Sequence, residues 1–130
     1  MEKETGPINK DIAVEVKCRF VPEESDLANS YFFFAYTITI TNNGSSPSQL
    51  IERHWTITDG FGKSTVVDGA GVVGKQPVLG PGQSFEYTSF CPLSTPTGSM
   101  QGYYDMRSSQ GIMSCAQIPV FFLMKDNLYH

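Results

Sequence analysis

The spacing Gly69-x-Gly71-x-x-Gly74 matches the glycine fingerprint that binds the pyrophosphate group of a dinucleotide. That chemistry needs a helix that begins at the last glycine, because the helix N-terminus supplies N–H donors and a positive dipole. Pro77 and Pro81 lie within the next seven residues and exclude such a helix. The motif therefore predicts a glycine-rich loop that crosses between sheets, and not a Rossmann site.

A loop of this kind can still bind a small anion through its backbone amides, without any helix. A lysine follows the last glycine, and an arginine lies on a preceding segment, so both cations could add charge beside the loop. The predicted anion loop consists of Gly69, Gly71, Gly74, Lys75 and Arg53. The alternative is that the glycines only allow unusual backbone angles and close packing, because they lack a side chain.

Few side chains could form a catalytic or metal centre. The chain has two histidines and three cysteines, none at short spacing: His54, His130, Cys18, Cys91 and Cys115. Composition allows Cys91 and His54 to act as a nucleophile pair, but no spacing supports it. The pattern also lacks the clustered ligands that a metal ion needs. We therefore predict no catalytic residue, no metal ligand and no cofactor, and a chain that is not an enzyme.

The segment from Tyr31 to Tyr36 places aromatic rings on both faces of one strand, since side chains alternate along a strand. A sandwich uses only one of these faces as its core. We predict that the outward residues, Phe33 with Tyr31, form a contact surface for a protein partner or for a second copy of the chain in a homodimer. The alternative is that residues 23–29, or the tail from Phe121, cover Phe33.

The elements that position these groups are strands. Segments with alternating apolar residues, separated by turn residues such as Asn43-Gly44 and Asp59-Gly60, indicate strands, and no segment shows a helical repeat. Seven strands are predicted, over residues 12–20, 31–41, 49–58, 63–68, 83–90, 101–107 and 112–118. Such a series predicts an all-β fold, an antiparallel β-sandwich of the immunoglobulin or fibronectin type III-like kind, with a barrel as the alternative.

Within the third strand, Trp55 is predicted to be the core tryptophan of the sandwich, with Ile51 and Ile57 on the same side. Arg53 shares the face of Trp55, and His54 points to the opposite face. His54 is predicted to be a surface or packed histidine rather than a catalyst.

The composition limits the class of protein. A chain of 130 residues fits one domain, predicted over residues 12–123, between a flexible tail over residues 1–11 and a C-terminal tail over residues 124–130. The net charge of −4 argues against direct nucleic-acid binding, and no apolar run is long enough to span a membrane. An odd number of cysteines and the lack of a signal-peptide pattern predict an intracellular, reducing compartment.

The chain resembles the ApaG domain family over about residues 12–123. The segments that carry the resemblance are Arg53-His54-Trp55-x-Ile57-x-Asp59, Gly69-x-Gly71-Val72-Val73-Gly74-x-Gln76-Pro77-Val78-Leu79, Pro81-Gly82-x-Ser84-Phe85-Glu86-Tyr87-Thr88-Ser89, Cys91-Pro92-Leu93, Thr97-Gly98-Ser99-Met100 and Ile118-Pro119. The resemblance implies a fibronectin type III-like sandwich. It implies no catalytic residues, because none are established for the family.

The resemblance also implies two alternative roles. The leading hypothesis is a non-catalytic protein-interaction module, as part of a larger adaptor such as an F-box ubiquitin-ligase substrate receptor or a polymerase-associated protein. The alternative is a small-anion or nucleotide (pyrophosphate) sensor linked to divalent-cation (cobalt and magnesium) efflux and homeostasis.

Overall fold

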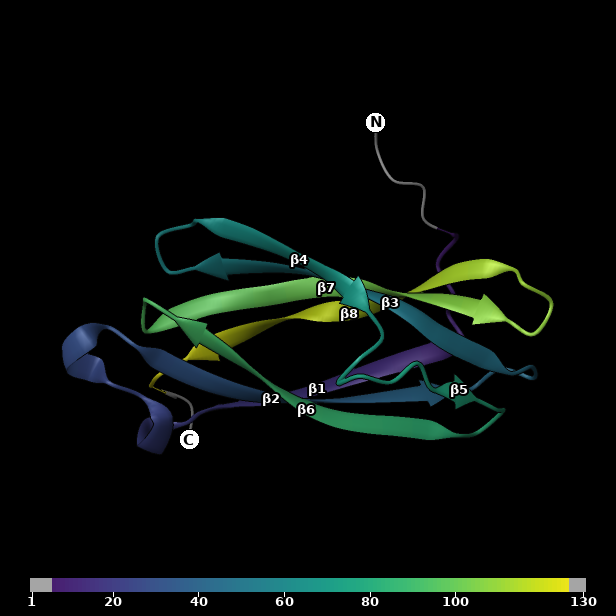
Figure 1. Cartoon of the computed structure of the whole chain (residues 1–130), viewed down its shortest axis with the longest axis horizontal. Coiled ribbons are helices and arrows are strands. Elements are labelled where there is room, and N and C mark those ends of the chain that lie inside the picture. Colours follow the sequence, from purple (N-terminus) through teal and green to yellow (C-terminus); the bar gives the residue numbers. More distant parts are fainter. Residues whose placement is uncertain (1–5, 127–130) are drawn as a thin grey trace.

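The structure is a computed structural model that describes residues 6–126, which form two β-sheets packed face to face (Figure 1). The strands are β1 (Ile12–Phe20), β2 (Phe32–Asn42), β3 (Ser48–Asp59), β4 (Ser64–Ala70), β5 (Val78–Leu79), β6 (Ser84–Leu93), β7 (Thr97–Ser108) and β8 (Met113–Met124). Two 3-10 turns, η1 (Pro22–Glu24) and η2 (Leu27–Asn29), connect β1 to β2. The predicted β-sandwich is confirmed, and two separate sheets exclude the barrel.

The smaller sheet has the strand order β1-β2-β6, and the larger has the order β4-β3-β7-β8 with β5 added beside β3. All pairs between these strands are antiparallel. The seven predicted strands are all present. The sequence did not reveal β5, because two residues are too few to show alternation. The last strand extends beyond its predicted end, through the apolar run 118–123 to Met124.

The core lies between the sheets and follows from the alternation in β2. Its inward side chains are all buried: Phe32, Phe34, Tyr36, Ile38 and Ile40. From the larger sheet, Trp55 packs its ring edge to face against Tyr36 and Phe121, at centroid distances of 5.5 and 5.9 Å. Trp55 is 3% exposed, which confirms its predicted burial in the core.

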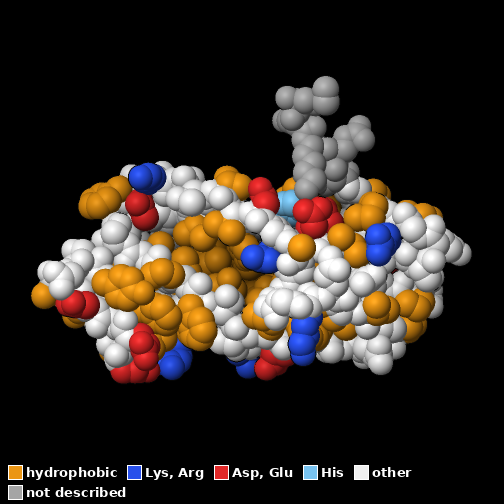
Figure 2. All heavy atoms as spheres, viewed as in Figure 1, with side chains coloured by type: hydrophobic (Ala, Val, Ile, Leu, Met, Phe, Trp, Pro, Cys, Tyr) orange, Lys and Arg blue, Asp and Glu red, His pale blue; other side chains and the backbone are white. Residues whose placement is uncertain are grey.

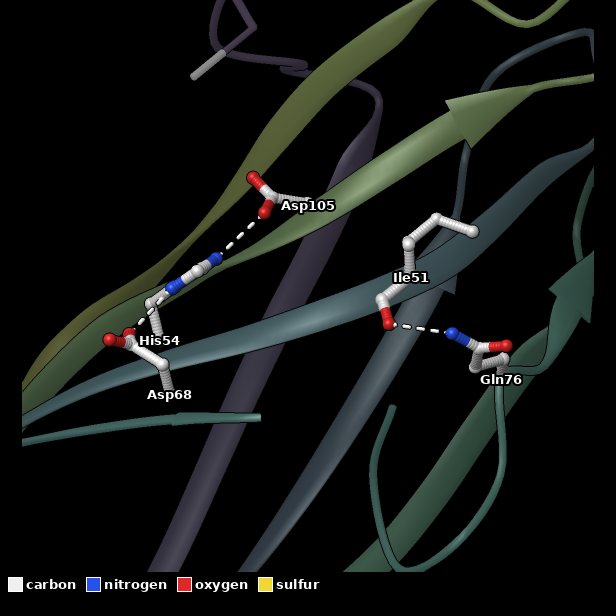
Figure 3. A network of polar contacts seen from close by, with 5 residues as sticks. All are labelled: Ile51, His54, Asp68, Gln76 and Asp105. Carbon is white, nitrogen blue, oxygen red and sulfur yellow. Dashed lines mark hydrogen bonds and ion pairs between the residues drawn. The ribbon is translucent and has the colours of Figure 1, made fainter. Parts of the chain in front are cut away.

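A β-bulge in β3 changes the alternation that the sequence predicted. The register against β7 shifts between Leu50 and Glu52, so one residue of β3 has no direct partner. As a result Leu50 is fully buried, whereas Ile51, which was predicted on the core side, is half-buried. The carbonyl oxygen of Ile51 is then free to accept hydrogen bonds from the glycine loop, including one from Gln76 Nε2 at 2.9 Å (Figure 3).

The chain before β1 differs from the predicted tail. Residues 1–5 and 127–130 lie outside the described residues, but Pro7 to Asn9 run beside β8. The Cys115 amide donates to the Pro7 carbonyl at 2.9 Å, and the Asn9 amide donates to the Cys115 carbonyl at 2.8 Å. Of the predicted tail over residues 1–11, Pro7 to Asn9 are thus paired with an outer strand of the larger sheet. Across residues 6–126, no helix has the length and apolar character to cross a membrane.

Candidate functional site

The first half of the glycine motif takes part in backbone pairing. Gly69 lies in β4 directly opposite Arg53 of β3. The Gly71 amide donates to the Ile51 carbonyl at 2.8 Å, and Gly71 has a positive φ of 61°. A Cβ atom at Gly69 would lie 2.7 Å from Arg53 Nη2, so the glycine leaves room for the guanidinium group. These two glycines serve close packing, which was the alternative to the anion loop.

The second half of the motif is a tight turn. Val72 and Lys75 exchange two backbone hydrogen bonds of 2.8 and 2.9 Å. Val73 and Gly74, between them, have positive φ angles of 44° and 79°. The amides of Gly71, Val72 and Lys75 are thus already bonded to backbone carbonyls. Much of the donor set that an anion nest would offer is used by the loop itself.

Arg53 connects the loop to the larger sheet. Its Nη1 donates to the carbonyl oxygens of Ala70 and Gly71 at 3.0 and 2.9 Å. The side chain also lines an open pocket of about 210 Å³ between the sheets, together with Trp55 and Gly74. The view in Figure 2 shows a hollow with a hydrophobic floor on this side of the sandwich. Among residues 6–126, the ion pairs do not include one between Arg53 and a carboxylate.

Phenol groups line the interior beside this pocket. Tyr36 hydrogen-bonds Ser89, and the hydroxyl of Tyr87 hydrogen-bonds that of Tyr104 from the facing sheet. Burial raises the pKa of Tyr36, Tyr87 and Tyr104, against a smaller opposite effect of the Arg53 charge. The phenols are therefore neutral hydrogen-bonding groups. Of the predicted anion loop, the pocket contains Arg53 and Gly74, whereas the exposed Lys75 does not line it.

The predicted partner residues lie on the outer face of the smaller sheet. Tyr31 and Phe33 are 6.1 Å apart between ring centroids, and Phe33 stacks on Phe90 of β6 at 5.3 Å. Tyr31 is 41% exposed and Phe90 is 56% exposed, while Phe33 is half-buried. We call Tyr31, Phe33 and Phe90 the aromatic surface. Phe90 was not predicted as part of it, because only the strand pairing reveals that β6 places this ring beside Phe33.

The loop over residues 23–29 was the alternative cover for Phe33. Its Ser25 Oγ accepts a hydrogen bond from the Phe33 amide at 2.9 Å, so it anchors the backbone of β2. Tyr31 and Phe90 stay exposed, and Phe33 stays half-buried. Away from the rings, hydroxyl groups pair across this face, as in Thr37 with Thr88 at 2.8 Å and Thr41 with Ser84 at 2.7 Å. The aromatic surface is thus an apolar cluster at one end of a polar sheet face.

The outer face of the larger sheet carries a cluster that the sequence did not predict. His54 Nδ1 lies 2.6 Å from Asp68 Oδ1, and His54 Nε2 lies 2.7 Å from Asp105 Oδ2 (Figure 3). The Tyr103 ring stacks on the imidazole at a centroid distance of 4.5 Å. His54 and Asp105 are each only 6% exposed. His54 is a packed histidine, one of the two predicted states.

Glu52 completes this cluster, and the prediction that ligand groups are not clustered is wrong. One possible ligand atom each from Glu52, His54 and Asp105 lies within 4.8 Å of the others. We call these three residues with Asp68 the His54 cluster. Glu52 and His54 are close in β3, but Asp68 comes from β4 and Asp105 from β7, so sequence spacing does not reveal the whole set. A signal was nevertheless present, since Asp is depleted in strands and Asp105 falls inside a predicted strand.

A groove extends from the His54 cluster along the outer face of the larger sheet. It has a volume of about 860 Å³ and includes His54, Asp68 and Tyr103 in its lining. Cys91, by contrast, is buried on the inner face of the other sheet, where burial raises its pKa to about 11. The structure therefore does not bring together the Cys91–His54 pair that composition allowed.

Comparisons with known proteins agree on one family. A family model described as the ApaG domain matches residues 22–108. A protein named Protein ApaG from Methylobacterium sp. (strain 4-46) is 57% identical over 114 residues, which are 88% of each chain. One of the same name from Bdellovibrio bacteriovorus is 48% identical over 130 residues, all of both chains. The crystal structure of the putative ApaA protein from Bordetella pertussis superposes with a TM-score of 0.86 at 48% identity, over 93% of this chain and 97% of that one. The chain belongs to the ApaG domain family.

Proposed function

We propose that this chain is a non-catalytic protein-interaction module, and that the aromatic surface is its contact site. The observation that carries the proposal is the cluster of the Tyr31, Phe33 and Phe90 rings on the solvent side of the smaller sheet, where Phe33 stacks on Phe90. Aromatic residues are enriched in the buried centres of protein interfaces, because they bury much area while losing little conformational freedom. The hydroxyl pairs farther along the same face supply the polar rim that such interfaces have.

The partner of this surface is a protein that presents an apolar segment. The outward residues of β1 next to β2, among them Lys17 and Arg19, add charge to the rim. A role inside a larger adaptor, such as an F-box ubiquitin-ligase receptor or a polymerase-associated protein, would use the same surface to recruit the bound protein. The two relatives described above are matched over 88% and 100% of their length.

The test is site-specific photo-crosslinking in the cells that produce the protein. A photoreactive aromatic residue replaces Phe90 in one variant and Phe61 in a control. Phe61 is the matched control because it is an exposed aromatic residue in the β3–β4 turn, away from the aromatic surface. We expect one specific adduct from position 90, which Phe33→Ser abolishes, and none from position 61. Equal labelling at both positions, or none at either, would overturn the proposal; an adduct of twice the chain mass identifies a homodimer.

One observation favours a second candidate, the binding of a small anion such as pyrophosphate. Arg53 places a half-buried positive charge at a pocket edge, beside the phenols of Tyr36 and Tyr87 and without a carboxylate ion pair among the described residues. A buried or partly buried charge is stabilised by an opposite charge. A sensor of this kind is the role that the resemblance links to cobalt and magnesium homeostasis.

Amide NMR spectra recorded with increasing pyrophosphate test the second candidate. We expect pyrophosphate to shift the amide resonances of Val73 and Gly74, which line the pocket. Lys75→Gln should keep these shifts, and Arg53→Gln should remove them. Unshifted resonances at millimolar pyrophosphate would contradict anion binding and leave the aromatic surface unaffected.

A further inference from the structure

We propose that Glu52, His54 and Asp105 bind one divalent transition-metal ion on the outer face of the larger sheet. The proposal is independent of the aromatic surface, which belongs to the other sheet.

The backbone brings the three ligand groups to one point. Glu52 and His54 are two residues apart in β3 and therefore point to the same face, and Asp105 of β7 is the direct register partner of Glu52. Their candidate ligand atoms lie within 4.8 Å of one another. An ion bonded at about 2.0–2.2 Å from nitrogen and oxygen needs ligand atoms roughly 3–4 Å apart, so small side-chain rotations suffice.

Asp68 orients the histidine in the way that metal-binding histidines usually require. Such a histidine donates its second ring N–H to a carboxylate, which fixes the tautomer and turns the other nitrogen toward the metal. His54 Nδ1 faces Asp68 Oδ1 at 2.6 Å, and Nε2 faces Asp105 at 2.7 Å. When Nδ1 carries the proton of a neutral ring, Nε2 presents a lone pair to a carboxylate. That contact is favourable only with a second proton or with a cation between the two groups.

The charge of the cluster favours a metal cation over a proton alone. Three carboxyl groups, from Glu52, Asp68 and Asp105, lie around one imidazole, and such an oxygen-rich set of groups suits a divalent cation. Glu52 and Asp105 are directly opposite each other, an arrangement that destabilises an antiparallel pair of strands. Asp105 and His54 are also nine-tenths buried, where negative charge is costly. A divalent ion removes this repulsion.

The ligand types indicate which ion fits. One imidazole nitrogen with two carboxylate oxygens suits Zn²⁺ or Mn²⁺, whereas Mg²⁺ and Ca²⁺ prefer oxygen ligands alone. Three protein ligands leave at least one position for water, as in open zinc sites. Glu52 is only half-buried, so the cluster is open to solvent on its side.

Calorimetric titration with Zn²⁺ tests the site. The parent for this experiment carries Cys18→Ser and His130→Ala, because an exposed thiol and the second histidine would bind Zn²⁺ elsewhere. We expect one Zn²⁺ per chain. Glu52→Gln removes a half-buried ligand with little effect on the fold, and it should weaken binding more than tenfold. Asp68→Asn removes only the orienting partner and should weaken binding by about 10–100-fold. Glu86→Gln, a carboxylate on the other sheet, is the matched control and should bind as the parent does.

Three results would overturn the proposal. The first is a parent that binds no Zn²⁺, and the second is unchanged affinity in Glu52→Gln. The third is equal or tighter binding of Mg²⁺, which would remove the role of the imidazole. Asp105→Asn tests the remaining ligand, with circular dichroism to check its fold. If that variant does not fold, the Glu52→Gln result still decides the question.

Discussion

At His54, each ring nitrogen faces a carboxylate oxygen, and the ring face is covered by Tyr103. A histidine on the outside of a sheet thus becomes one of the most buried polar groups of the chain. The two carboxylates are not equivalent, because the Asp105 side chain is almost fully buried and that of Asp68 is largely exposed. Removal of the imidazole therefore affects mainly Asp105.

We expect His54→Ala to lower the free energy of unfolding by about 1–3 kcal/mol, because it leaves the buried Asp105 side chain without its hydrogen-bond partner. Asp68→Asn is the comparison, with an expected loss of about 0–1 kcal/mol, since its partner contact is at the surface. Urea unfolding at pH 7 measures both. Equal losses in the two variants would contradict the difference in burial.

Trp55 offers a second test at this scale. We expect Trp55→Ala to cost on the order of 3–5 kcal/mol, because it leaves a cavity beside Tyr36 and Phe121. Phe61→Ala changes a ring that is 88% exposed and should alter stability little. Native tryptophan fluorescence gives an independent check, since a solvent-exposed emission maximum is incompatible with the buried ring.

Among the elements, local features could be predicted from the sequence, and features set by strand pairing could not. In the loop between β4 and β5, the prolines after Gly74 correctly excluded a helix, and in β2 the alternation predicted the core face residue by residue. The bulge at Ile51 could not be predicted, because it depends on the pairing of β3 with β7. The His54 cluster escaped for the same reason: its carboxylates come from different strands, and their proximity is a property of register.

The backbone of the turn at Val73 is strained, so substitutions at Val73 and at Gly74 should change the stability of the fold in opposite directions. Val73 is β-branched and has a φ of 44°, a conformation that such side chains rarely adopt. We expect Val73→Gly to stabilise the fold by about 1 kcal/mol. Gly74→Ala introduces a side chain at a φ of 79° and should destabilise it by a similar amount. Thermal unfolding compares the two, and a destabilised Val73→Gly would show that the valine side chain contributes more than its backbone strain costs.

Over the whole molecule, neutral acids are concentrated between the sheets, and this predicts how stability depends on alkaline pH. Burial raises the pKa of Cys91 from 9.0 to about 11. The unfolded thiol therefore loses its proton at lower pH than the folded one, so the folded chain binds more protons in this range. Its contribution to stability is fully present below pH 9 and is lost as the pH rises to about 11.

Unfolding free energies measured from pH 8 to pH 11 test this dependence. The unfolding free energy of Cys91→Ala should decrease less steeply with pH than that of the parent. Between pH 8 and pH 11, the two decreases should differ by about 2–3 kcal/mol. The variant is less stable throughout because it loses packing, so the slopes are compared and not the absolute values. Parallel slopes would show that the thiol does not titrate between these limits.

The short segment from Pro7 to Asn9 has a consequence for solubility. By bonding both backbone groups of Cys115, it occupies part of the side of β8 that faces away from β7. An open strand there can pair with the same strand of another molecule and begin aggregation. The exposed Val120 and Phe122 farther along β8 would strengthen such pairing. A chain shortened to begin at Lys10 should therefore form soluble aggregates at concentrations where the intact chain stays dispersed, which light scattering would reveal.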